Sequence, residues 1–171
     1  GIHAIDVGLW LANANPVAAS GASRVARNDP HGDSHDVYSI TYEFPDGLLL
    51  NHRGEHLGNR FGFHCECSAY CREGYLDTAY DGQVRMLGIR EGWRGGEVKG
   101  LYPEGAQRNI KAFHQCVLGG DCANPTVEPS VNATLTTLLG REAAERKTRL
   151  TWGELLAENR RLEPNLSGLD A

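Results

Sequence analysis

The residues best suited to acid–base chemistry stand at the start of the chain, where His3 and Asp6 are three positions apart. Imidazole has its pKa near neutral pH, so a histidine can take a proton from a substrate hydroxyl. On a helix this spacing puts both side chains on one face, where Asp6 could orient the imidazole or bind a hydroxyl itself. Structural roles stay open: a hydrogen bond at a domain boundary for His3, and a buried anchor of the helix for Asp6.

Sulfur chemistry is suggested by the run His64–Cys67 and by Cys71 beyond it, residue types that bind zinc. The alternation places Cys65 and Cys67 on one strand face with Phe61 and Phe63, and turns His64 and Glu66 to the other face. Thiols on an apolar face pack as small hydrophobic groups. The two remaining cysteines, Cys116 and Cys122, do not form a C-x-x-C pair. We therefore expect packing here and no metal.

Two further groups of polar residues could contact ligands. One lies in a loop and could hold a metal, although solvated loop residues are the more ordinary interpretation. The other ends a strand and suits hydroxyls or a carboxylate, although such a cluster is more often plain surface. The first group comprises His31, Asp33, His35 and Asp36, and the second comprises Asn51, His52, Arg53 and His56.

The long segment from Trp93 to Tyr102 is rich in glycine and carries aromatic and basic side chains, including Arg94 and Lys99. Long loops of this kind often cover a ligand site. Asn109 and His114 follow on the next predicted helix and could face a domain boundary. We predict that Arg53, Trp93, Arg94, Asn109 and His114, together with Asp6, bind the substrate.

The elements that must position these residues follow from periodicity. Apolar residues at helical spacing predict helices over 2–13, around Ile110–Val117 up to Gly119, and from Pro129 onward. The capping box Thr151–Glu154 predicts a last helix that turns Trp152, Leu155 and Leu156 inward. Alternation and turn residues predict six strands, at 17–24, 37–44, 48–53, 61–68, 74–79 and 83–87, with a Gly-rich loop over 88–105. Strands before helices indicate one α+β domain over 1–171: an open, mainly antiparallel six-stranded sheet with helices packed on one face.

Composition narrows the function classes. The chain has 171 residues, 17 Lys and Arg against 22 Asp and Glu, and a net charge of −5. A nucleic-acid partner would require a basic footprint, and a membrane span would require a long apolar run, so neither is expected. An odd number of cysteines, 5, indicates reduced thiols in a cytoplasmic protein. The first residues read as the middle of an element, which predicts a fragment of a longer protein.

An ordered set of motifs resembles one family across almost the whole chain. The motifs are His3-Ala4-Ile5-Asp6 with Trp10, Tyr42-Glu43-Phe44-Pro45-Asp46-Gly47, Asn124-Pro125-Thr126-Val127-Glu128-Pro129-Ser130, Leu138-Leu139-Gly140-Arg141-Glu142-Ala143-Ala144, and Thr151-Trp152 with Glu154. In this order they resemble the C-terminal domain of the Gfo/Idh/MocA oxidoreductases, a family named for glucose–fructose oxidoreductase and inositol dehydrogenase.

The resemblance implies a substrate-binding and dimerisation domain whose parent uses NAD or NADP to oxidise a sugar or cyclic polyol. It implies that His3 is catalytic, that a Rossmann domain precedes this one, and that the open sheet forms a homo-oligomer. No G-x-G-x-x-G and no Lys-Pro pair is present, so this chain alone is expected to bind no dinucleotide. Two alternatives remain: a non-catalytic ligand-binding or dimerisation module, and an NAD-dependent glycosidase-type relative.

Overall fold

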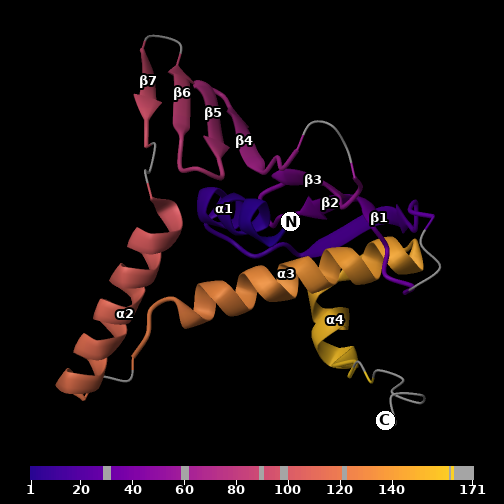
Figure 1. Ribbon diagram of the computed structural model, residues 1–171. Coiled ribbons are helices and arrows are strands. Elements are labelled where there is room, and N and C mark those ends of the chain that lie inside the picture. The colour runs from indigo at the N-terminus through magenta and orange to yellow at the C-terminus, as the bar shows by residue number, and fades with distance from the viewer. Residues whose placement is uncertain are drawn as a thin grey trace.

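The computed structural model describes residues 1–28, 32–58, 62–88, 91–96, 100–120, 123–161 and 163. Within these ranges the chain forms helices and strands in an α+β arrangement, as predicted (Figure 1). In chain order they are α1 (Ile2–Ala12), β1 (Ala18–Arg24), β2 (Val37–Glu43), β3 (Leu49–Glu55), β4 (Glu66–Cys71), β5 (Gly74–Ala79), β6 (Val84–Gly88), β7 (Gly92–Gly95), α2 (Leu101–Gly119), α3 (Val127–Arg146), β8 (Leu150–Thr151) and α4 (Trp152–Glu158).

The strands form two four-stranded antiparallel sheets, so the prediction of one six-stranded sheet is wrong. The first sheet has the order β3-β2-β1-β8, and the second has the order β4-β5-β6-β7. The predicted strand over 61–68 fails at Gly62, whose φ of 73° interrupts the extended backbone. The strand instead begins at Glu66, where it pairs with β5 alone and leaves β3 as the edge of the first sheet.

The first sheet holds the main hydrophobic core, and α1 and α3 cover one of its faces (Figure 1). Alternation along β2 turns Ile40 and Tyr42 toward these helices. They pack with Ile5 of α1 and with Leu139 of α3. The N-terminal helix is thus fixed by core packing, and this fixes the place of His3 on its first turn.

The α1 helix also joins the two sheets. A Cβ on Gly8 would lie 2.3 Å from Leu50 Cδ1 of β3 and 4.0 Å from Cys67 Sγ of β4. Any larger residue at position 8 would force the Leu50 side chain to move. Consequently α1 bridges the gap where the predicted six-stranded sheet divides.

The Gly-rich segment 88–105 contains more regular structure than a loop. Residues Gly92–Gly95 pair with β6 as β7, and α2 begins at Leu101 after Gly100, whose φ is 73°. The helix ends at Gly119 as predicted, but it has no buried residue, and Figure 1 shows it projecting away from the sheets. Lys99 lies outside the described residues.

The last helix starts with the predicted capping box. Thr151 accepts a hydrogen bond from the backbone N–H of Glu154, and the Glu154 carboxylate accepts one from the Thr151 N–H. Trp152 and Leu155 pack against the core, but Leu156 is 49% exposed, so its predicted inward position is wrong. No helix in the described part of the chain is long and apolar enough to cross a membrane.

Candidate functional site

A cavity of about 460 Å³ lies between α1, the second sheet and the start of α2. His3 and Asp6 line it from α1, and Cys65, Glu66 and Cys67 line it from the beginning of β4. The turn after β5 adds Tyr80, and α2 adds Leu101 and Tyr102. The two residues first singled out for acid–base chemistry therefore lie in one cavity. In the described structure no hydrogen bond joins their side chains, so mutual orientation by direct contact stays a prediction.

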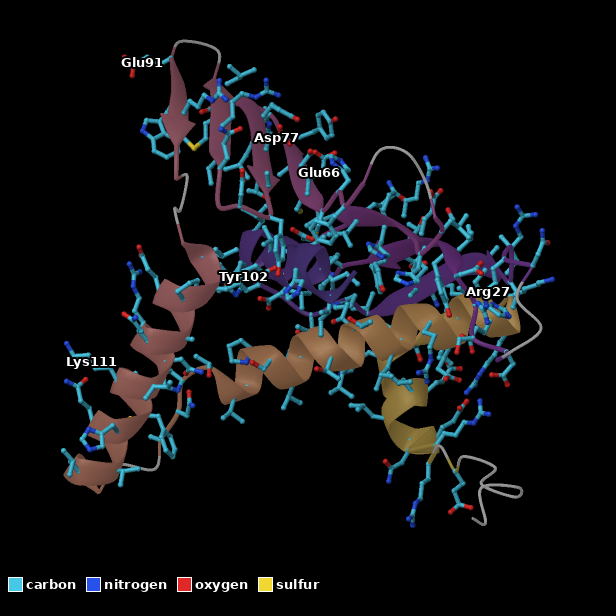
Figure 2. The ribbon with its side chains drawn as sticks, viewed as in Figure 1. Arg27, Glu66, Asp77, Glu91, Tyr102 and Lys111 are labelled. Carbon is cyan, nitrogen blue, oxygen red and sulfur yellow. The ribbon has the colours of Figure 1, made fainter. Side chains whose placement is uncertain are left out.

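His3 contacts one ring of an aromatic cluster. The ring of Tyr80 lies 5.2 Å from the His3 imidazole, centroid to centroid, and meets Phe63 edge-on at 5.0 Å. The hydroxyls of Tyr102 and Tyr80 share a hydrogen bond of 3.1 Å, and this contact raises the pKa of Tyr80. Figure 2 shows Tyr102 at the first turn of α2. An imidazole beside phenol hydroxyls provides a proton acceptor together with groups that can bind substrate hydroxyls.

The two cysteines in the cavity are half-buried and do not indicate a metal site. Burial, with Cys65 and Asp77 nearby, raises the pKa of Cys67, which disfavours the thiolate that zinc binds. No group of three potential ligands for a metal occurs within the described ranges. His64 faces Glu66, 3.2 Å away.

The predicted apolar face around these thiols is wrong in one respect. Phe63 precedes β4 and is 76% exposed, because the strand begins at Glu66, five residues later than predicted. Phe61 and Cys122, which belonged to the same predictions, lie outside the described residues.

The other predicted substrate-binding residues lie elsewhere. Arg53 is on the exposed face of β3, where it pairs with Glu55. Arg94 lines a separate cavity, and Trp93 is half-exposed on β7. Asn109 and His114 are exposed on α2. None of these side chains lines the cavity of His3, so the structure brings together only His3 and Asp6 of that set.

The two polar groups predicted from sequence have structural contacts. Asp36 accepts hydrogen bonds from the backbone N–H groups of Ala26 and Arg27, and it pairs with the Arg27 side chain at 3.1 Å. His35 Nδ1 lies 2.6 Å from the Ser23 hydroxyl. Burial lowers the pKa of His52, which favours its neutral form. His31 lies outside the described residues.

Tyr80 is the residue of the cavity that sequence reasoning missed. It stands just before Asp81-Gly82, a pair typical of a hairpin turn, and the pair predicts a backbone conformation and no chemical role for Tyr80. Its role depends on contacts with His3, Phe63 and Tyr102, which are far apart in the chain. The signal that could have predicted its place in the cavity is a tyrosine beside a hairpin turn, close in sequence to the Gly-rich segment.

No protein-family model and no curated protein matches this chain. Among solved structures, it is similar to the aldose-aldose oxidoreductase from Caulobacter crescentus, with 18% identity and a TM-score of 0.68 over 88% of this chain and 45% of that one. It is also similar to myo-inositol 2-dehydrogenase from Lactobacillus plantarum, with 16% identity and a TM-score of 0.65 over 88% and 46%. A third similar structure is scyllo-inositol dehydrogenase from Lactobacillus casei, solved with NAD(H) and scyllo-inositol. It has 17% identity and a TM-score of 0.62 over 89% of this chain and 46% of that one.

These neighbours are oxidoreductases of sugars and polyols, and the chain spans less than half of each. The resemblance read from the motifs is confirmed at the level of the fold: the chain has the fold of one domain of the Gfo/Idh/MocA-type oxidoreductases.

Proposed function

We propose that the chain is the substrate-binding domain of an NAD(P)-dependent oxidoreductase that acts on a sugar or a cyclic polyol. The observation that carries the proposal is the cavity where His3, Asp6, Tyr80 and Tyr102 converge, in a fold shared with sugar and polyol oxidoreductases. Its volume of about 460 Å³ falls in the range of small-molecule sites.

The side chains of the cavity suit a polyhydroxylated ring. Tyr80 and Tyr102 each carry a hydroxyl that can donate and accept, and Asp6 accepts from substrate hydroxyls. The aromatic rings of the two tyrosines present flat apolar faces that can contact the C–H groups of a sugar. His3, held beside Tyr80, takes the proton of the hydroxyl that is oxidised, the role for which neutral imidazole is suited.

We expect the dinucleotide to bind outside the described residues of this chain. A pyrophosphate needs a glycine-rich turn at the N-terminus of a helix, where backbone N–H groups are free. In α2, whose N-cap is a glycine, the Glu104 side chain already lies beside Gly100 and places a negative charge in the first turn. We therefore assign NAD or NADP to another domain of the full protein and substrate recognition to this one.

The test is a binding measurement on the chain itself. We expect scyllo-inositol, myo-inositol or an aldose to shift the NMR signals of His3, Tyr80 and Tyr102 in a saturable way. His3→Ala should weaken binding by about fivefold, the cost of one hydrogen bond. His114→Ala, which removes an exposed imidazole on α2, is the matched control and should bind like wild type. If no sugar or polyol shifts these signals, the cavity is not a polyol site.

We also propose that two copies associate through a sheet. The two alternatives named from sequence, a non-catalytic module and a glycosidase-type relative, keep the same cavity and differ in whether the full protein turns over NAD(P)H. A turnover assay of the full protein with the polyol that binds best separates them from the first proposal.

A further inference from the structure

A second cavity lies against the face of the second sheet that carries Asp77, and it shares only Thr78 and Ala79 with the lining of the His3 cavity. Paired residues of antiparallel strands point to one face, so Ser68, Asp77, Arg85 and Arg94 form a row across all four strands. Cys67 and Thr78 occupy the other face, which contributes to the first cavity. Arg94 therefore lines this second cavity and does not line that of His3.

The row contains two guanidinium groups and one carboxylate, so its net charge is positive. The Asp77 carboxylate accepts a hydrogen bond from Ser68 over 2.8 Å and one from Arg85 over 3.2 Å. These contacts outweigh the partial burial of the carboxyl and hold the pKa of Asp77 below its usual value, so it stays ionised at neutral pH. Both of its oxygens are occupied, and Figure 2 shows Asp77 in the middle of the sheet.

Arg94 has no hydrogen-bond or ion-pair partner within the described part of the chain. It lies directly across from Arg85 in the register of β6 and β7. Like charges at directly opposed positions destabilise an antiparallel pair. The one carboxylate nearby, Asp77, pairs with Arg85 and leaves Arg94 without a counter-charge, which an anion bound beside Arg94 would supply.

The space for that anion is present. Asp77, Arg85, Arg94, Ala79 and Gln83 line a cavity of about 170 Å³ on this face. The Gln83 amide adds a neutral donor to the two guanidinium groups, a set that matches the oxygens of a phosphate or carboxylate.

We propose that this cavity is a binding site for an oxyanion group, a phosphate or a carboxylate, held by Arg94 and Arg85 with Gln83. The group can be a free ion or part of a sugar acid or sugar phosphate. Its three ligands do not line the His3 cavity, and its test does not depend on polyol oxidation.

The experiment titrates the chain with inorganic phosphate at constant ionic strength and follows the side-chain N–H signals of arginine and glutamine by NMR. We expect saturable shifts at Arg85, Arg94 and Gln83. Arg94→Gln should weaken phosphate binding about tenfold or more, because charge-assisted hydrogen bonds are lost. Arg72→Gln, at an exposed arginine on the β4–β5 turn without a partner in the described residues, should bind like wild type.

Further arms replace phosphate by acetate and by glucose 6-phosphate. Tighter binding of the sugar phosphate than of free phosphate identifies a group carried by a larger ligand, and equal binding identifies the free ion. Uniform, non-saturating shifts at every arginine, or equal affinity in Arg94→Gln, would overturn the proposal. So would shifts at Arg94 that appear without phosphate as protein concentration rises, because a second copy would then be the occupant.

Discussion

Tyr42 shows how tightly the core beneath the site is packed. Its side chain is fully buried, and its hydroxyl is one of the buried polar groups in the described structure that lack a hydrogen-bond partner. A Cβ on Gly140 of α3 would lie 2.0 Å from that oxygen. Burial raises the pKa of Tyr42 well above its usual value, so the phenol stays neutral. The helix can cross the sheet here only because residue 140 has no side chain.

Changes at these two positions should have opposite effects on the free energy of unfolding. Tyr42→Phe removes a hydroxyl that is buried without a partner, so we expect stability to rise by about 1 kcal/mol. Gly140→Ala forces a methyl group against Tyr42, and we expect a loss of about 1–3 kcal/mol or more. Urea denaturation measures both.

The control is Gly153→Ala in α4, where a Cβ meets nothing within 4 Å. It should be neutral or slightly stabilising, because alanine favours a helix over glycine. Equal stability of Gly140→Ala and Gly153→Ala would contradict the close approach of α3 to Tyr42.

At the scale of elements, one carboxylate joins α3 to the segment after α4. Glu142 is almost fully buried, and it accepts hydrogen bonds from Arg141 and Arg146 of its own helix and from Arg160 beyond α4. Although burial opposes it, these bonds hold the pKa of Glu142 below its usual value of 4.5. Arg146 also pairs with Glu158 at 2.7 Å, so the network fixes α4 against α3.

This network should make stability depend on pH. Because the pKa of Glu142 is lower in the folded chain, its contribution is complete above 4.5 and is lost as pH falls through the folded value. Glu142→Gln should cost about 1–3 kcal/mol at neutral pH and should flatten the decline below pH 4.5. Melting temperatures from pH 7 to pH 3 test this. Glu128→Gln at the exposed start of α3 is the control, and a parallel decline in all three proteins would remove Glu142 from the acid response.

Local sequence signals predicted the elements whose conformation depends on near neighbours. The β2–β3 hairpin followed from alternation around Pro45-Asp46-Gly47, and α4 followed from its capping box. The start of β4 was wrong because alternation cannot reveal the positive φ of Gly62. The β7 strand was missed although it pairs with the preceding strand, because its sequence, Gly-Trp-Arg-Gly, carries no apolar alternation. The residues of the candidate site also divide into those that local sequence predicts and those that depend on tertiary contacts. The types and spacing of His3 and Asp6 could be read from the chain, whereas the place of Tyr80 depends on tertiary packing.

At the scale of the whole molecule, the second sheet leaves an apolar row uncovered. Ala69, Leu76, Met86 and Trp93 occupy paired positions on the face opposite Asp77 and Arg94. Met86 is 45% exposed and Trp93 is 52% exposed. The outward residues of β2 and β3 in the first sheet are more polar, including Ser39, Thr41 and Asn51, so the apolar row is the better candidate for contact between copies. Contiguous exposed apolar residues usually mark an interaction surface.

We therefore expect the chain to form a dimer through this row, in which a symmetric contact buries the row of each copy against the other. Light scattering after gel filtration should report a mass near twice 18.7 kDa at high concentration. Met86→Ser should shift the equilibrium toward monomer, because it leaves a polar group in an apolar contact. Val25→Ser removes an exposed apolar side chain outside both sheets and should leave the mass unchanged. A monomer at every concentration, or a dimer that Met86→Ser does not weaken, would show that another surface, such as the exposed α2, mediates any contact.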